Sequence, residues 1–219
     1  MDEDERPVVI GYDGGPGAAD ALALGLGWAE ILGSGAVAVV VYPGPAPISP
    51  GRVDAEWVAE RRAEAQSLLD EARQLAGTTD MDLRAVGSGS ASHGLHDVAE
   101  ELKASLIVLG SPQRPQTRLL GATSGDRVIA GAPCPVSIPP LGWRDRTRRQ
   151  LRRIGVAFVP TPDGREALRV AANFARHVGA RLHVVTVVGR RSGSDVLSHR
   201  RRRGADVRCR SQGGIPTRD

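Results

Sequence analysis

The chain has 219 residues, of which 41% are hydrophobic and only 3% aromatic, so its core should be built from aliphatic side chains. Its two cysteines, Cys134 and Cys209, give neither a disulfide framework nor the ligand spacing of a metal site. The longest apolar run, residues 36–42, is too short to cross a bilayer, and the acidic first residues do not form a signal peptide. We therefore expect a cytoplasmic protein that does not contact a membrane.

The formal net charge of +4 is unevenly distributed along the chain. Residues 189–219 hold nine arginines against three aspartates, a net charge of +6, so the other 188 residues carry +4 − 6 = −2. This basic segment has neither a strand period nor a helix period, and we expect it to be disordered. It also lacks aromatic platforms and a groove-reading helix, so we predict no specific binding of nucleic acid.

Short apolar segments alternate with amphipathic ones over the first two thirds of the chain. The predicted strands are residues 7–12, 36–42, 82–86, 106–109 and 135–139. The predicted helices are residues 18–32 and 54–76, a third capped by Ser90 or Ser92, and a fourth containing Val128 and Ile129. The buried stripe of the second helix is predicted to be Trp57, Val58, Ala65, Leu68, Leu69, Ala72 and Leu75. Strands that are apolar throughout indicate a parallel sheet covered on both faces.

The ends of two predicted strands carry groups suited to a ligand. Asp13-Gly14 follows the first strand, and Gly110-Ser111 follows the fourth. A polar loop then leads to Gly121-Ala122-Thr123-Ser124 at the start of a helix, where free backbone N–H groups and a positive helix end can cradle phosphate. Ligands of parallel α/β sheets bind beyond the carboxyl ends of the strands, so the sequence places a carboxylate opposite a phosphate loop.

These segments resemble the universal stress protein family. Its phosphate segment reads Gly-x-x-Gly, about nine residues and then Gly-Ser/Thr, to which 110–124 and the following APCPVSI are similar. The segment VVIGYDG at 8–14 resembles the family's first strand with its adenine-contacting aspartate. The resemblance implies an open parallel five-stranded sheet in the order 3-2-1-4-5 with helices on both faces, a Rossmann-like fold of the adenine nucleotide alpha hydrolase type. It also implies a stress-response regulator or sensor that binds ATP, with magnesium accompanying ATP, and that forms a homodimer through strand five.

The resemblance also implies which residues bind the nucleotide. They are Tyr12, Asp13, Gly14, Val40, Val41, Gly110, Ser111, Gln113, Arg114, Gly121, Ala122, Thr123 and Ser124. The chain departs from the pattern at Gln113 and Ala122, and its loop is shorter by about two residues, which should lengthen the distances from backbone N–H groups to phosphate. We therefore expect weak ATP binding held mainly at Asp13. The alternative is the same fold with a degenerate site, acting as a protein-interaction module.

The sequence contains no set of residues typical of an enzyme active site or a metal site. There is no Ser-His-Asp set, paired acidic cleft or Gly-Lys-Thr/Ser loop, so we expect no enzyme beyond a very weak ATPase. His93 and His96 lack a third metal ligand and are interpreted as surface residues. Cys134, between two prolines, is interpreted as a buried structural thiol. Asp13 could also be an ordinary turn residue, and Arg114 a solvated loop arginine.

The chain repeats part of itself at an offset of 146 residues. The matched pairs are Pro16 with Pro162, 21–22 with 167–168, Trp28 with Phe174 and Gly33 with Gly179. We predict a universal stress protein domain at 1–140, an Arg-rich linker at 141–152, a partial second unit of strand, helix and strand at 153–188, and a disordered basic tail at 189–219. Val159 stands where the first unit has Asp13, so the second unit is assigned no nucleotide site.

Overall fold

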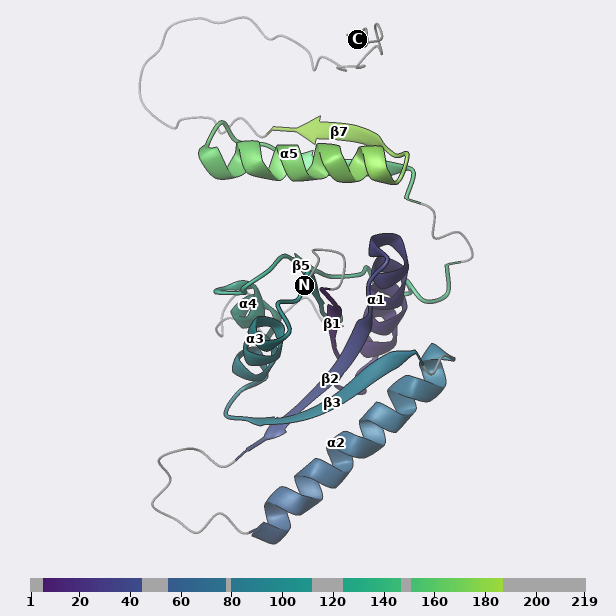
Figure 1. The fold of residues 1–219 in the computed structure, drawn as a ribbon, viewed down its shortest axis with the longest axis vertical. Helices are drawn as coiled ribbons and strands as arrows, with labels where there is room; N and C mark the ends of the chain where they lie inside the picture. Colours follow the sequence, from purple (N-terminus) through teal and green to yellow (C-terminus); the bar gives the residue numbers. More distant parts are fainter. Residues whose placement is uncertain (1–5, 45–54, 78–79, 112–123, 147–150, 187–219) are drawn as a thin grey trace, which may run out of the picture.

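The computed structural model describes residues 6–44, 55–77, 80–111, 124–146 and 151–186. Within these ranges five parallel strands form one sheet in the order β3-β2-β1-β4-β5, which confirms the predicted fold (Figure 1). The strands are β1 (Val8–Gly11), β2 (Ala36–Pro43), β3 (Met81–Ser88), β4 (Leu106–Val108) and β5 (Val136–Ser137). Val8 of β1 lies opposite Ala36 of β2 on one side and Leu106 of β4 on the other. The carboxyl ends of these central strands therefore meet at one edge of the sheet.

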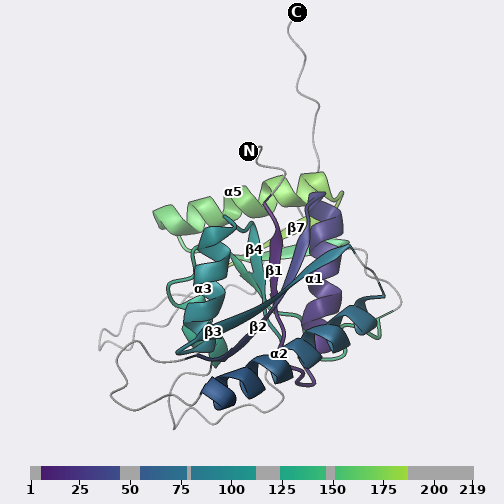
Figure 2. The same ribbon diagram turned by 60° about the horizontal axis from the view of Figure 1, so that its bottom comes forward.

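Helices cover both faces of this sheet, and each face has its own core. The helices α1 (Ala18–Leu32) and α2 (Ala55–Ala76) cover one face, and α3 (Ala91–Glu101) and α4 (Ser124–Ile129) cover the other (Figure 2). Val8, Val9 and Ile10 are all 0% exposed because β1 is covered from both sides. This double burial explains why the strand is apolar at every position.

Local signals in the sequence fix where the helices begin and end. Gly33 ends α1 in the left-handed region, with a φ of 63°. Ser90 is the residue that caps α3, since its Oγ accepts a hydrogen bond of 3.2 Å from His93 N. Gly25 lets α1 lie directly on β1, because a Cβ there would be 2.4 Å from Ile10 Cγ1. These positions therefore fix how α1 and α3 sit on the sheet.

The structure differs from the sequence-based expectation at several element ends. β3 begins one residue earlier and ends two residues later than predicted, whereas β5 is reduced to Val136–Ser137 between prolines that cannot donate to a ladder. In α2, Trp57 is 42% exposed and Leu75 is 51% exposed, so these two assignments to the buried stripe are wrong. A helix of 22 residues is about 33 Å long and overhangs the strands of eight residues, about 26 Å, on which it lies.

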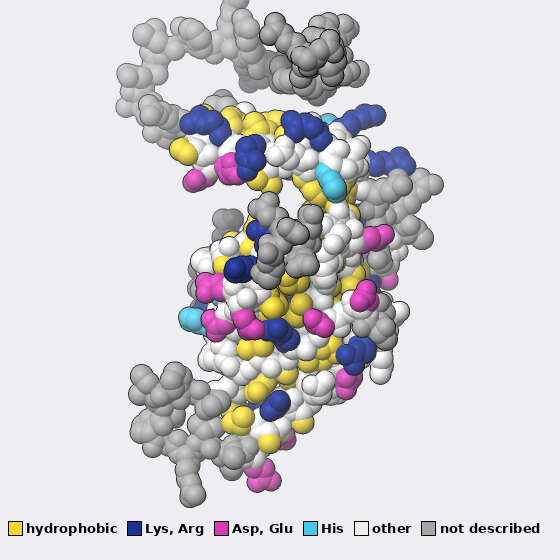
Figure 3. All heavy atoms as spheres, viewed as in Figure 1, with side chains coloured by type: hydrophobic (Ala, Val, Ile, Leu, Met, Phe, Trp, Pro, Cys, Tyr) yellow, Lys and Arg dark blue, Asp and Glu magenta, His cyan; other side chains and the backbone are white. Residues whose placement is uncertain are grey.

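A second, separate sheet follows the first. β6 (Arg153–Ala157) and β7 (Arg181–Val185) pair in parallel, and α5 (Pro162–His177) connects them. The predicted strand, helix and strand are thus present, and Thr161 Oγ1 caps α5 by accepting from Gly164 N at 3.1 Å. Most residues of this unit are exposed or only half-buried. Figure 3 shows apolar surface lying between basic side chains over it. The predicted tail at 189–219 lies outside the described residues.

Candidate functional site

The chain segments that follow β1 and β4 touch at the amino-terminal end of α1. A Cβ on Gly17, the N-cap residue of α1, would lie 2.5 Å from the carbonyl oxygen of Ser111. A Cβ on Gly110 would lie 2.7 Å from the carbonyl carbon and oxygen of Gly17. Only glycine fits at either position, because a side chain on either would collide with backbone that cannot give way. Two backbone segments and a positive helix end therefore meet at the edge where such sheets bind ligands.

Asp13 lies in the turn beside this contact, and its side chain is exposed. Its Oδ1 accepts a hydrogen bond of 2.9 Å from Gly15 N, which is the pattern of an Asx turn. Gly14 has a φ of 69°, and a Cβ there would be 2.6 Å from Leu68 Cδ2 of α2. Asp13 therefore stabilises a turn, which is one of the two roles predicted for it. The same turn places its negative charge at the edge of the sheet.

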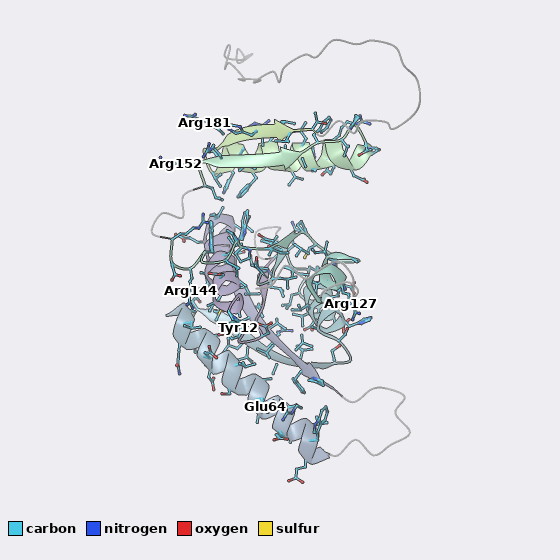
Figure 4. The ribbon with its side chains drawn as sticks, turned by 180° about the vertical axis from the view of Figure 1, so that it is seen from behind. Tyr12, Glu64, Arg127, Arg144, Arg152 and Arg181 are labelled. Carbon is cyan, nitrogen blue, oxygen red and sulfur yellow. The ribbon has the colours of Figure 1, made fainter. Side chains whose placement is uncertain are left out.

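Tyr12 points into the core rather than toward solvent. Its side chain is 3% exposed and belongs to the cluster beneath α1 and α2. Burial, a hydrogen bond to Glu71 and the negative charges of Glu71 and Asp13 raise the pKa of Tyr12 from 10.0 to about 12. The positive charge of Arg144 opposes this shift, and Figure 4 shows Tyr12 and Arg144 near the same end of α1. The phenol therefore stays protonated at neutral pH and donates its proton to Glu71.

Val40 and Val41 lie near the carboxyl end of β2 and point to opposite faces of the sheet. Val40 is 3% exposed in the cluster beneath α1 and α2. Val41 is half-buried against α3, where a Cβ on Gly94 would lie 2.8 Å from Val41 Cγ1. Of the two predicted residues, Val41 is therefore the one that can give a ligand an apolar contact.

Ser111 connects the segment after β4 to the segment after β5, because its Oγ donates a hydrogen bond to the carbonyl oxygen of Pro139. The hydroxyl proton is thus used within the protein, and the oxygen keeps only acceptor capacity for a ligand. The predicted residues Gln113, Arg114, Gly121, Ala122 and Thr123 lie outside the described residues. Ser124 begins α4, and its side chain also lies outside them. The phosphate half of the predicted site therefore stays a prediction.

Asp20 is a residue that sequence reasoning did not single out. It is 3% exposed in the first turn of α1, where its Oδ2 accepts from Gly142 N and its Oδ1 from Arg144 N, each at 2.8 Å. These bonds fasten the segment after β5 to α1, next to the Tyr12 end of the site. No sequence signal marks this role, because an acidic residue in a first turn is expected simply to complement the helix dipole.

The remaining candidate residues have structural partners. His93 Nδ1 lies 3.0 Å from Ser90 Oγ, and His96 Nε2 lies 2.8 Å from the carbonyl oxygen of Val128. Cys134 is only half-buried, and burial raises the pKa of its thiol. No group of three or more His, Cys, Asp or Glu residues that could hold a metal ion occurs in the described part of the chain.

The sheet order and the glycine contact at its carboxyl edge place the chain among the open, doubly covered parallel α/β proteins. The family model described as the universal stress protein family matches residues 5–139, more than half of the chain. The chain therefore belongs to the universal stress protein family, as its motifs predicted.

Individual relatives agree with this assignment. A universal stress protein of Mycobacterium tuberculosis (strain ATCC 25618 / H37Rv) is 32% identical over 191 residues, which cover 82% of this chain and 63% of the relative. The chain thus matches less than two thirds of that relative's length. A solved universal stress protein from Archaeoglobus fulgidus DSM 4304 has a TM-score of 0.64 at 18% identity and covers 88% of this chain and 68% of its own. A universal stress protein solved in complex with cAMP has a TM-score of 0.50 at 22% identity, covering 64% of this chain and 100% of its own.

A membrane-spanning helix is absent from the part of the chain that the structure describes: none of the helices there is both long and apolar enough to cross a bilayer.

Proposed function

We propose that this chain is a cytoplasmic regulator of the stress response that senses an adenine nucleotide at the carboxyl edge of its five-stranded sheet. The observation that carries the proposal is the backbone contact of Gly17 with Gly110, with the exposed carboxylate of Asp13 beside it. Asp13 accepts hydrogen bonds from the adenine or the ribose, and the positive end of α1 attracts phosphate. The related protein that was solved with cAMP supports this class of ligand.

The expected ligand is ATP with magnesium, bound more weakly through its phosphates than through its nucleoside. Gln113 carries a Cβ where the family pattern has glycine, and the proton of Ser111 is already donated to Pro139. A charge-assisted hydrogen bond contributes about 1.5–3 kcal/mol, so losing one weakens binding about tenfold or more. Because the chain offers no catalytic set, any turnover of ATP is very slow.

Calorimetric titration of the whole chain with ATP and with adenosine tests this site. Asp13→Ala should abolish the binding of both, whereas Asp97→Ala, which removes an exposed carboxylate on α3, should change neither. Asp13→Asn keeps an oxygen that can accept from Gly15 N, so it separates the loss of charge from the loss of the turn. Unchanged ATP affinity in Asp13→Ala would place the nucleotide elsewhere.

The phosphate half is tested by repairing it. Gln113→Gly with Ala122→Ser and two residues restored to the loop should strengthen ATP binding more than adenosine binding, since only ATP reaches that loop. Equal improvement of both ligands would show that the weakness does not lie in the phosphate loop.

A second candidate function is protein interaction with a degenerate nucleotide site, favoured by the engaged Ser111 hydroxyl. It predicts that neither ATP nor adenosine binds although the fold is intact. In both cases we propose that the chain forms a homodimer through β5, beside which Ile138 is 41% exposed and Leu141 is 50% exposed. Light scattering should show a dimer that Ile138→Glu converts to a monomer, because the change places a charge in an apolar contact.

A further inference from the structure

The two sheets of this chain meet through positions that are equivalent in the internal repeat. The ring centroids of Trp28 in α1 and Phe174 in α5 are 4.8 Å apart, with an interplanar angle of 38°. His177 Nε2 of α5 lies 3.2 Å from the carbonyl oxygen of Ile31 in α1. Both contacts join residues separated by the repeat offset, since 174 − 28 = 146 and 177 − 31 = 146.

The ends of the two helices keep the same offset. Gly33 follows α1 with a φ of 63°, and Gly179 follows α5 with a φ of 66°, so that 179 − 33 is again 146. An interface in which equivalent positions face one another is isologous, which means that an approximate two-fold axis relates its halves.

We infer that the C-terminal half of α1 carries a docking surface, made of the outward side of Trp28 and the Ile31 carbonyl group. The partner that fits it is the equivalent helix face of a second strand–helix–strand unit. In this chain the occupant is its own α5, and docking there holds the unit at 153–185 to the first sheet.

The chemistry of the contact explains why α5, and not the α1 helix of a second copy, is the occupant. A carbonyl oxygen can only accept, so His177 must donate its Nε2–H to Ile31, and an α1 helix has no imidazole at that position. Charge also favours α5 over a second α1 as the occupant. The residue before Ile31 is the exposed Glu30, and the residue before His177 is the exposed Arg176. Two α1 helices would bring two glutamates to equivalent positions, whereas α1 with α5 brings opposite charges.

A contact with the first sheet fixes the orientation of Trp28 in the docking surface. Trp28 Nε1 donates a hydrogen bond of 3.2 Å to Ser137 Oγ of β5, which orients the indole. Among the described residues the second unit buries few large apolar side chains, because Val170, Val184 and Val185 are 51%, 52% and 56% exposed. A two-stranded sheet with one helix is marginal in water on its own, so its order depends on this contact.

Hydrogen exchange on the whole chain tests the inference. Phe174→Ala removes a ring that makes no hydrogen bond to the first sheet, and it should raise amide exchange in β6 and β7 by about tenfold. Exchange in β1 and β2 should not change. The matched controls are Val170→Ala on the exposed side of α5 and Trp57→Ala on α2, both of which should leave β6 and β7 protected.

Two further variants distinguish docking from a general loss of stability. Trp28→Ala combined with Phe174→Ala should expose β6 and β7 no more than the single variants do, because each already removes the same contact. Trp28→Phe combined with Phe174→Trp should restore protection, as an isologous pair predicts. Unchanged exchange in Phe174→Ala, or additive effects of the two alanine substitutions, would overturn the inference.

Protein concentration decides between the chain's own helix and a second copy. Protection of β6 and β7 in the unaltered chain should be the same over a hundredfold range of concentration, because the contact lies within one chain. Protection that falls on dilution, together with a dimer that Phe174→Ala dissociates, would overturn the assignment of the occupant to α5 of the same chain.

Discussion

The unit β1–α1–β2 and the unit β6–α5–β7 have the same connectivity and matched positions, yet they differ in burial. Ala38 of β2 is 0% exposed, whereas Val184, its counterpart at the offset of 146, is 52% exposed. Val39 is 1% exposed, and its counterpart Val185 is 56% exposed. The matched sequences therefore form the same strand, helix and strand in both units, and burial depends on whether neighbouring strands and helices cover them.

One pair of equivalent carboxylates shows the same contrast. Asp20 of α1 is buried and accepts two backbone hydrogen bonds from the segment after β5. Glu166 of α5, at the equivalent position, is exposed and pairs with Arg169 one turn further along its own helix. The residue in the first unit binds distant parts of the chain together, and the residue in the second makes only a local pair.

Core truncation should separate the two units most strongly. Ile10→Ala removes a fully buried side chain beneath α1 and should lower the free energy of unfolding by about 2–5 kcal/mol. Val156→Ala, at the equivalent position of β6, should leave the main unfolding transition unchanged, because the first sheet does not need it. Urea unfolding followed by circular dichroism measures both. Equal losses would show that the two sheets form one cooperative unit.

The carboxylate pair gives the next largest difference. Asp20→Ala leaves the amides of Gly142 and Arg144 without their acceptor and should cost about 1–3 kcal/mol of stability. Glu166→Ala should give no measurable change, since exposed helix pairs contribute little. Both effects can be read from chemical unfolding, with Asp20→Asn as the variant that keeps one acceptor. A destabilised Glu166→Ala variant would contradict the contrast.

Tyr12 predicts a pH dependence for the first unit alone. Its folded pKa of about 12 lies above the ordinary value of 10.0, so the unfolded chain loses the proton first. The stability that Tyr12 contributes is complete below pH 10 and is lost between pH 10 and 12. Tyr12→Phe should remove this decline and cost about 1 kcal/mol at neutral pH, the net worth of its hydrogen bond. Tyr42→Phe is the control, and its stability should fall over that range as in the unaltered chain.

The smallest effect is expected at the end of the chain. Deleting residues 189–219 should leave the melting temperature nearly unchanged, because that segment has no period with which to join either sheet. Any affinity for DNA should vanish with it and fall steeply with salt. Differential scanning calorimetry and a filter-binding assay provide the two measurements. A large drop in melting temperature would show that the segment packs against the fold.

Much of the fold could be predicted from the sequence because its signals are local. Gly33 ends α1 where expected, and the apolar strands predicted a sheet covered on both faces. The burial or exposure of a side chain could not be predicted from local sequence where it depends on distant parts of the chain. Trp57 and Leu75 fit the helical stripe of α2, yet both are exposed, because a helical period does not show how far the strands beneath the helix extend.

The candidate site shows the same limit. The glycines at 17 and 110 each look like ordinary turn residues, and only their mutual contact shows that neither can carry a side chain. Asp20 gives no local sign that its partners lie 122 and 124 residues further on. The order of the strands came from a family resemblance, because no residue in a single strand states which neighbour it will pair with.

The hydrogen bonds of Asp20 also limit when the first sheet can form while the chain is being synthesised. α1 leaves the ribosome early, but the amides that satisfy its buried carboxylate belong to residues 142 and 144. At about 5–20 residues per second, they follow roughly 6–25 seconds later. Until then the nascent chain holds a helix whose inner carboxylate still needs water, and α1 cannot settle fully against β1. The first sheet therefore closes only after its last strand has been made, and its carboxyl edge is completed at the same moment.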